Sequence, residues 1–196
     1  MFDFRNHGES DSSPNGGKTA VGLEEYRDVL AAMDYLQSNE NTTDMDVGFV
    51  SFCMGANSTI IAMSKQPEVF RNVKCIVAVQ PISMEVFVRT YAKKRFTNVG
   101  GKLLFPIVKA FVNWQSTHRL EDMSPASYVK DIKVSTLYVQ VRNDPWTELS
   151  DITGFYENTP SEKEFFWLEG FSHRFQGYQY FGYRPEKMLA WHKKWM

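Results

Sequence analysis

The segment 47–57 reads Val47-Gly48-Phe49-Val50-Ser51-Phe52-Cys53-Met54-Gly55-Ala56-Asn57. Its first half is a continuous apolar run, which is typical of a strand buried on both faces. Its second half runs directly into a helical pattern that continues to Lys65, and a thiol stands at the junction. A turn of this kind holds a nucleophile exposed in a strained conformation, and the residues two before and two after it must be small because the backbones pass closely. Ser51 and Gly55 meet that requirement.

The same alternation of apolar runs and helical periodicity extends over the chain and predicts an α/β fold with a mostly parallel sheet and flanking helices. The predicted strands are Asp46–Phe52, Lys74–Gln80, Val134–Val141 and Glu164–Leu168, with a strand remnant at Met1–Phe4. The predicted helices are Gly22–Gln37, Met54–Lys65, Thr147–Asn158 and Pro185–Lys194.

One segment interrupts this alternation. Residues 83–125 lie between two predicted strands and are too many for a simple crossover, so we expect two or three amphipathic helices that form a cap. The chain then divides into core residues 1–82 with the strand-to-helix turn, the helical cap insertion 83–125, and core residues 126–196.

Several motifs resemble those of the α/β-hydrolase superfamily. Ser51-Phe52-Cys53-Met54-Gly55 is similar to the G-x-S-x-G nucleophile elbow, with cysteine in place of serine as in the dienelactone hydrolases. Asp3-Phe4-Arg5-Asn6-His7-Gly8-Glu9-Ser10 is similar to the D-x-R-G-H-G-x-S segment of many members. Asp144 follows the third long strand and His173 the fourth, in the family's order of nucleophile, acid and histidine.

The resemblance implies a hydrolase of carboxylic ester, thioester or lactone bonds. Cys53 would attack as a thiolate and form a thioester acyl-enzyme, His173 would act as base and acid, and Asp144 would orient the imidazole. The Met54 backbone N–H would be the first oxyanion donor. No cofactor is implied, and no spacing of His, Cys or carboxylates predicts a metal site.

The family's strand that carries the second oxyanion donor has no counterpart, so the chain is expected to be N-terminally truncated. A half-built oxyanion hole predicts weak activity, because one donor is typically worth about 3 kcal/mol in the transition state. An open sheet edge beside Asp46–Phe52 also predicts a homo-oligomer. The alternatives are a non-catalytic binding or interaction protein with the same fold and an acyltransferase, since fold does not fix function.

The bulk composition narrows the partners. With 22 basic and 23 acidic side chains the net charge is −1, which gives no indication of nucleic-acid binding. No leader or membrane-spanning run occurs, and the only cysteines are Cys53 and Cys75, so we expect a cytoplasmic protein without membrane contact that acts on a small-molecule acyl substrate. Residues 86–120 nevertheless contain no acidic residue, which indicates a solvated helix face, an anionic substrate group or an anionic membrane surface. The basic residues there are Arg89, Lys93, Lys94, Arg95, Lys102, Lys109 and Arg119.

Overall fold

The structure, a computed structural model, describes residues 2–14 and 16–196. These residues form a four-stranded sheet in the order β1-β2-β3-β4, and every neighbouring pair is parallel. The strands are β1 (Val47–Phe52), β2 (Val73–Val79), β3 (Ser135–Val141) and β4 (Lys163–Leu168). The predicted fold class is confirmed, and each long strand begins and ends within one residue of its prediction.

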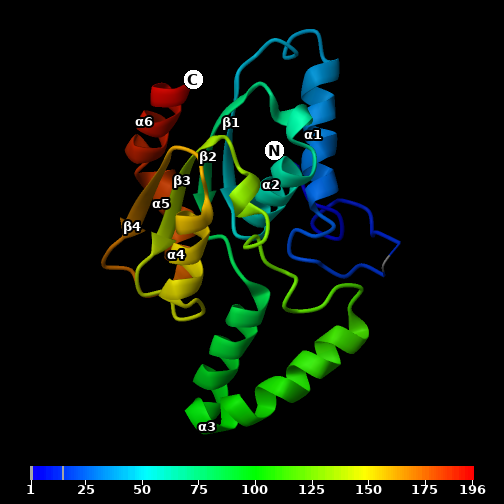
Figure 1. The fold of residues 1–196 in the computed structure, drawn as a ribbon, viewed down its shortest axis with the longest axis vertical. Helices are drawn as coiled ribbons and strands as arrows, with labels where there is room; N and C mark the ends of the chain where they lie inside the picture. Colours follow the sequence, from blue (N-terminus) through cyan, green and yellow to red (C-terminus); the bar gives the residue numbers. More distant parts are fainter. Residues whose placement is uncertain (1, 15) are drawn as a thin grey trace.

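The helices connect these strands and cover both faces of the sheet (Figure 1). They are α1 (Tyr26–Ser38), α2 (Met54–Lys65), α3 (Met84–Gln115), α4 (Leu149–Asn158), α5 (Arg174–Tyr183) and α6 (Glu186–Trp195), with short 3-10 turns at Pro67–Phe70 and Val129–Asp131. The bounds of α2 match the prediction. Helix α5, which follows β4, was not predicted.

Two apolar cores lie on opposite faces of the sheet because side chains alternate along each strand. Ile76 of β2 and Tyr138 of β3 face a core shared with α1, α2 and α4. Val77 of β2 and Val139 of β3 face the other core, to which α5 and α6 contribute Phe181 and Trp191. The continuous apolar runs in the sequence follow directly from this three-layer arrangement.

Helix α3 stands away from the sheet as two arms (Figure 1). The arms meet at Phe96 and Thr97, whose backbone is not helical, and Thr97 has a φ of 67°. The second arm then passes close to the first: a Cβ on Gly101 would lie 2.4 Å from the Cα of Lys93, so only glycine fits. Within the described residues, no helix is long and apolar enough to cross a membrane.

Much of the positive charge of α3 is neutralised inside the structure. Arg89 and Lys93 both form ion pairs with Glu148, at 2.9 and 3.6 Å. Lys109 pairs with Glu85 at 3.1 Å and with Glu121 at 3.4 Å. Glu85 and Glu121 belong to the cap segment itself, whereas Glu148 precedes α4, so the pairs of Arg89 and Lys93 are the ones that tie α3 to the core.

The predicted strand remnant at Met1–Phe4 is wrong in the part that the structure describes. Residues 2–4 are irregular, and Met1 lies outside the described residues. The rings of Phe2 and Phe4 pack edge to face at 5.3 Å. A single short strand has no hydrogen-bonded ladder unless a neighbour lies alongside it, and the described residues supply none at this position.

Strand β1 is an edge of the sheet. Within the described residues it pairs with β2 alone. A cavity of about 780 Å³ runs along the unpaired side, between β1, α1 and the N-terminal loop, and Tyr35, Leu36, Val47 and Phe49 are among its lining residues. In the described part of the chain this side of β1 is therefore unpaired, as the sequence led us to expect.

Candidate active site

Cys53 lies at the turn between β1 and α2. Its backbone angles are φ 50° and ψ −116°, a conformation that an L-residue adopts only under strain. The turn is held from both sides, since the Cys53 N–H donates to the Val79 carbonyl at 2.8 Å and the Cys53 carbonyl accepts from the Asn57 N–H at 3.1 Å. The thiol is half-buried. This is the backbone geometry of a nucleophile elbow.

Small and polar residues of α2 keep the elbow in place. Ser51 is buried and its hydroxyl bonds to that of Thr59 at 2.8 Å. The fully buried amide of Asn57 donates to the carbonyls of Val21 and Ile82 and accepts from the Ile82 N–H at 3.1 Å. Asn57 thereby ties two loops to the first turn of α2. No local pattern signals this role, because the two partner residues are 25 and 36 positions away from Asn57.

Met54 opens α2, so its backbone N–H belongs to the first turn of the helix. The first N–H groups of a helix have no intrahelical partner and are available to an anion. The side chain of Met54 points elsewhere, and its sulfur accepts from the Thr19 hydroxyl at 3.1 Å.

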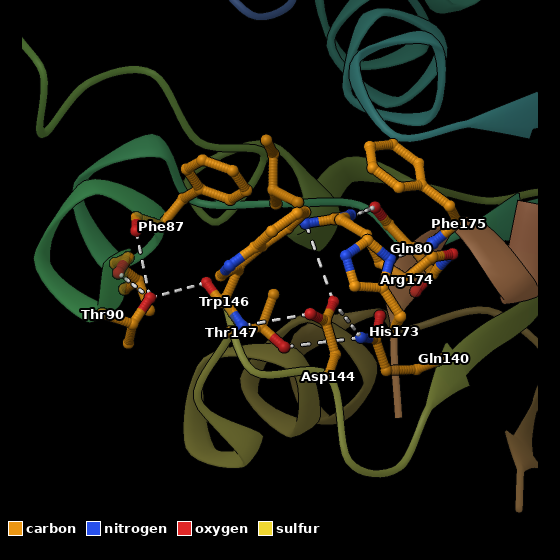
Figure 2. A network of polar contacts seen from close by, with 12 residues as sticks. Gln80, Phe87, Thr90, Gln140, Asp144, Trp146, Thr147, His173, Arg174 and Phe175 are labelled. Carbon is orange, nitrogen blue, oxygen red and sulfur yellow. Dashed lines mark hydrogen bonds and ion pairs between the residues drawn. The ribbon is translucent and has the colours of Figure 1, made fainter. Parts of the chain in front are cut away.

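Asp144 follows β3 and is buried. One carboxylate oxygen accepts from the Trp146 N–H at 3.1 Å, and the other accepts from the Gln140 amide at 3.2 Å (Figure 2). The second oxygen also faces Nη1 of Arg174 at 3.6 Å, and both of these side chains are almost completely shielded from solvent. The acid that the sequence singled out therefore pairs with a cation.

His173 follows β4 and occupies the N-cap position of α5. Its Nδ1 accepts from the Phe175 N–H at 3.4 Å, and the Gln176 side chain accepts in turn from the His173 N–H at 3.2 Å. A neutral imidazole that accepts at Nδ1 carries its proton on Nε2. The ring lies edge-on to Trp146, with centroids 4.7 Å apart.

The structure brings the three predicted residues to the same end of the sheet, after β1, β3 and β4 (Figure 2 shows Asp144 and His173 together). It does not link them. Across residues 2–14 and 16–196, no hydrogen bond joins His173 to Asp144 or to Cys53. The carboxylate is held by Arg174, and the histidine caps a helix.

Three residues that the sequence reasoning missed surround this site. Arg174 is 2% exposed and donates from Nη2 to the Gln80 carbonyl at 3.1 Å and from Nε to the Tyr178 hydroxyl at 2.7 Å. Gln80 has a φ of 52° and donates its amide to the Arg174 carbonyl at 2.7 Å. Gly177 permits this approach, because a Cβ there would lie 2.6 Å from Nε2 of Gln80.

Cys75 lies in β2 with no exposed surface, and burial raises the pKa of its thiol. A buried thiol with a raised pKa is a packing group rather than a nucleophile. The two cysteines therefore occupy different environments, as the sequence indicated.

The parallel sheet, the strained elbow after its edge strand and the acid and histidine loops after later strands together define the α/β-hydrolase fold. Comparison with solved structures agrees. An esterase of Pyrococcus furiosus superposes with a TM-score of 0.72 at 23% sequence identity, covering 99% of this chain and 69% of that one. The resemblance read from the sequence is confirmed as a fold.

Other structures show the same likeness. An acetyl xylan esterase from Paenibacillus sp. R4 gives a TM-score of 0.68 at 15% identity, over 99% of this chain and 64% of its own. A dienelactone hydrolase from Anabaena variabilis gives 0.57 at 16% identity, over 90% of this chain and 61% of its own. No protein-family model and no curated protein sequence matches the chain.

Proposed function

We propose that the protein hydrolyses carboxylic esters of small molecules, with Cys53 as nucleophile. The observation that carries the proposal is the backbone of Cys53, because a strained thiol at the carboxyl end of a strand and the start of a helix has a catalytic use and no packing advantage. The esterases and the dienelactone hydrolase among the structural neighbours support the same reaction class.

In the proposed reaction the Cys53 thiolate attacks the ester carbonyl carbon while His173 takes the thiol proton. The Met54 N–H stabilises the oxyanion of the tetrahedral intermediate, and the C–O bond breaks as His173 returns the proton to the leaving alcohol. Water, deprotonated by His173, then attacks the thioester. The C–S bond breaks, the carboxylic acid leaves and the thiol regains its proton.

In these reaction steps Asp144 acts indirectly, by orienting the imidazole of His173. For this role the imidazole must release the Phe175 N–H and present a protonated Nδ1 to Asp144, which requires the carboxylate to turn from Arg174. Both contacts are long, at 3.4 and 3.6 Å, so neither is a strong hydrogen bond, but the charge of Arg174 opposes the turn because both side chains are buried. We propose this rearrangement as the step that assembles the triad.

The surroundings favour an acyl group with an apolar body. Phe87, Trp146 and Phe175 form a chain of edge-to-face contacts beside His173, with centroids 5.5 and 5.8 Å apart. Such aromatic walls are typical of acyl pockets. In the described part of the chain Lys94 and Lys102 form no ion pair, unlike Lys93 and Lys109. Because an unpaired ammonium group can bind an anion, we also propose that the substrate carries an anionic group.

Incubating the protein with activated esters and thioesters is expected to give an acyl adduct on Cys53 that intact-mass spectrometry and peptide mapping detect. Activated esters acylate a nucleophile fast, so the thioester accumulates when its hydrolysis is the slower step. The control is Cys75→Ala, which should leave the adduct unchanged. Labelling of Cys75 instead of Cys53, or no adduct from any ester, would refute the proposed nucleophile.

A second candidate is a non-catalytic binding module, and the Asp144–Arg174 pair favours it, because a carboxylate held by a buried guanidinium is a common structural arrangement. An acyltransferase would form the same adduct but pass it to an acceptor other than water. The adduct experiment separates the binding module from both enzymes, and the decay of the adduct in water alone separates hydrolysis from transfer.

We also propose that two copies associate through the open edge of β1. The N–H groups of Val47 and Cys53 donate toward β2, so by the alternation of a strand Gly48, Val50 and Phe52 direct theirs to the unpaired side. Val50→Pro removes one of these donors and should convert a dimer to a monomer in size-exclusion chromatography with light scattering. Val50→Thr keeps the donor and should remain dimeric. A monomeric wild-type chain contradicts the proposal.

A further inference from the structure

The second arm of α3, residues 98–115, exposes an apolar stripe on its outer side. Its members recur at spacings of four and three positions, which places them along one side of a helix, and each is 55–79% exposed. They are Val99, Leu103, Ile107, Phe111 and Trp114. The inner side of the same arm is used by the fold, because Phe105 and Val112 pack on a buried apolar cluster and Lys109 pairs with Glu85.

The apolar stripe belongs to the largest concentration of exposed apolar residues on the described surface. Of the nineteen large apolar side chains that the described residues expose, nine lie between Tyr91 and Trp114. Exposed apolar residues that are scattered singly need no explanation, whereas a contiguous exposed apolar face marks an interaction site. The outer side of the arm is therefore a candidate docking surface.

The charge beside the apolar stripe indicates which partner fits it. Lys94, Arg95 and Lys102, which we call the basic turn, lie where the two arms meet, are exposed and form no ion pair in the described part of the chain. Residues 86–120 contain no Asp or Glu. A second copy on the same face would bring cations against cations, which is unfavourable, so the charge calls for an anionic partner.

An anionic lipid surface fits this face better than a folded protein does. The inner side of the arm is packed on the core, so a partner can cover only the outer side, as in helices that lie in the plane of a bilayer. Such helices combine Trp, Phe and Leu on one side with Lys and Arg beside them. The cap also stands away from the sheet, which leaves this side open to a broad surface (Figure 1).

We propose that the cap docks on an anionic membrane surface, with the apolar stripe among the lipid chains and the basic turn at the anionic headgroups. The sequence led us to expect no membrane contact, since the net charge is −1 and no spanning run occurs, but neither property describes the outer side of one helix. Phe87 of the first arm packs on Trp146, which contacts His173, so a docked cap holds the candidate active site near the surface.

The proposal does not rest on the proposed hydrolysis. An anionic substrate that is itself a lipid would meet Lys94 and Lys102 at the same surface. The probes are vesicles of phosphatidylcholine alone and vesicles that also contain phosphatidylserine, and the readout is co-sedimentation of the full chain. The protein should bind the anionic vesicles at low salt at least ten-fold more tightly than the neutral ones, and binding should weaken as salt screens the headgroups.

The variant Lys94→Gln with Lys102→Gln tests the basic turn. Each basic residue near an anionic surface is worth about five-fold in binding, so the double variant should bind the anionic vesicles roughly thirty-fold more weakly. Lys130→Gln with Lys193→Gln removes the same charge from exposed positions outside α3 and should bind as the wild type does. An equal loss in both double variants would show that only the total charge matters, which overturns the proposal.

The variant Leu103→Gln with Ile107→Gln tests the apolar stripe. It removes two apolar side chains and keeps a good helix former, so binding should weaken at least ten-fold. Met45→Gln with Leu189→Gln, also exposed, is the matched control and should bind normally.

Two outcomes reject the apolar stripe as a lipid-binding face. The first is that anionic vesicles do not bind the wild type, or bind the stripe variant equally well. The second comes from light scattering without vesicles: an oligomer that Leu103→Gln with Ile107→Gln dissociates would make a second copy the occupant of this face. Both differ from the absence of an acyl adduct, which refutes the proposed function.

Discussion

Replacing His173 by asparagine is expected to lower the rate of ester turnover by about 10²–10⁴-fold, the usual contribution of a general acid–base group. Asparagine is a good N-cap residue, so the variant should keep the hydrogen bond from the Phe175 N–H that now fixes the start of α5. The loss of rate would then come without a loss of stability. A rate assay with an activated ester, together with thermal unfolding, measures both.

His173→Ala serves as the comparison because it removes the base and the cap together, and it should add about 1 kcal/mol of destabilisation to the same loss of rate. His7→Ala is the matched control, since His7 is exposed and, among the described residues, its Nδ1 hydrogen-bonds only to the Arg5 carbonyl. An asparagine variant with full activity would show that the imidazole of His173 serves only as a helix cap.

The strands and the elbow were readable from the sequence because their signals are local. Continuous apolar runs mark strands that are covered on both faces, and Ser51, Cys53 and Gly55 lie within five consecutive positions. For the same reason α2 begins at Met54 as predicted, since the turn that fixes Cys53 also fixes the first residue of the helix.

Helix α5 escaped prediction because its sequence argues against a helix. Two glycines and five aromatic residues occupy its ten positions, and histidine is not among the usual N-cap residues. The spacing of His173 and Gln176, which form the capping box, was the one local signal. Arg174 could not have been found at all, because its partners Gln80 and Asp144 lie 94 and 30 positions away.

The strand predicted at Met1–Phe4 fails for a related reason. Alternating apolar residues describe a strand only where another strand lies alongside to complete the hydrogen bonds, and this information is not local. The structure instead leaves β1 as an edge, and the N-terminal loop is tied to α1 by Arg5, whose guanidinium pairs with Asp28 at 2.7 Å.

Arg174→Met is expected to destabilise the protein by about 3–5 kcal/mol, because it leaves the carboxylate of Asp144 buried without its cation. The urea midpoint followed by circular dichroism gives this value if the slope of the transition is unchanged. Arg184→Met, at the exposed end of the same helix, is the matched control and should lie within about 0.5 kcal/mol of the wild type.

The double variant Arg174→Met with Asp144→Asn tests whether the pair is the cause. Since the amide removes the uncompensated charge, the double variant should be more stable than Arg174→Met alone, with a coupling free energy of about 1–3 kcal/mol. Additive losses would show that Arg174 stabilises the fold through Gln80 and Tyr178 instead. The Asp144–Arg174 ion pair would then contribute nothing measurable to the free energy of unfolding. Arg174 would therefore not disfavour the turn of the Asp144 carboxylate toward His173 in the proposed reaction.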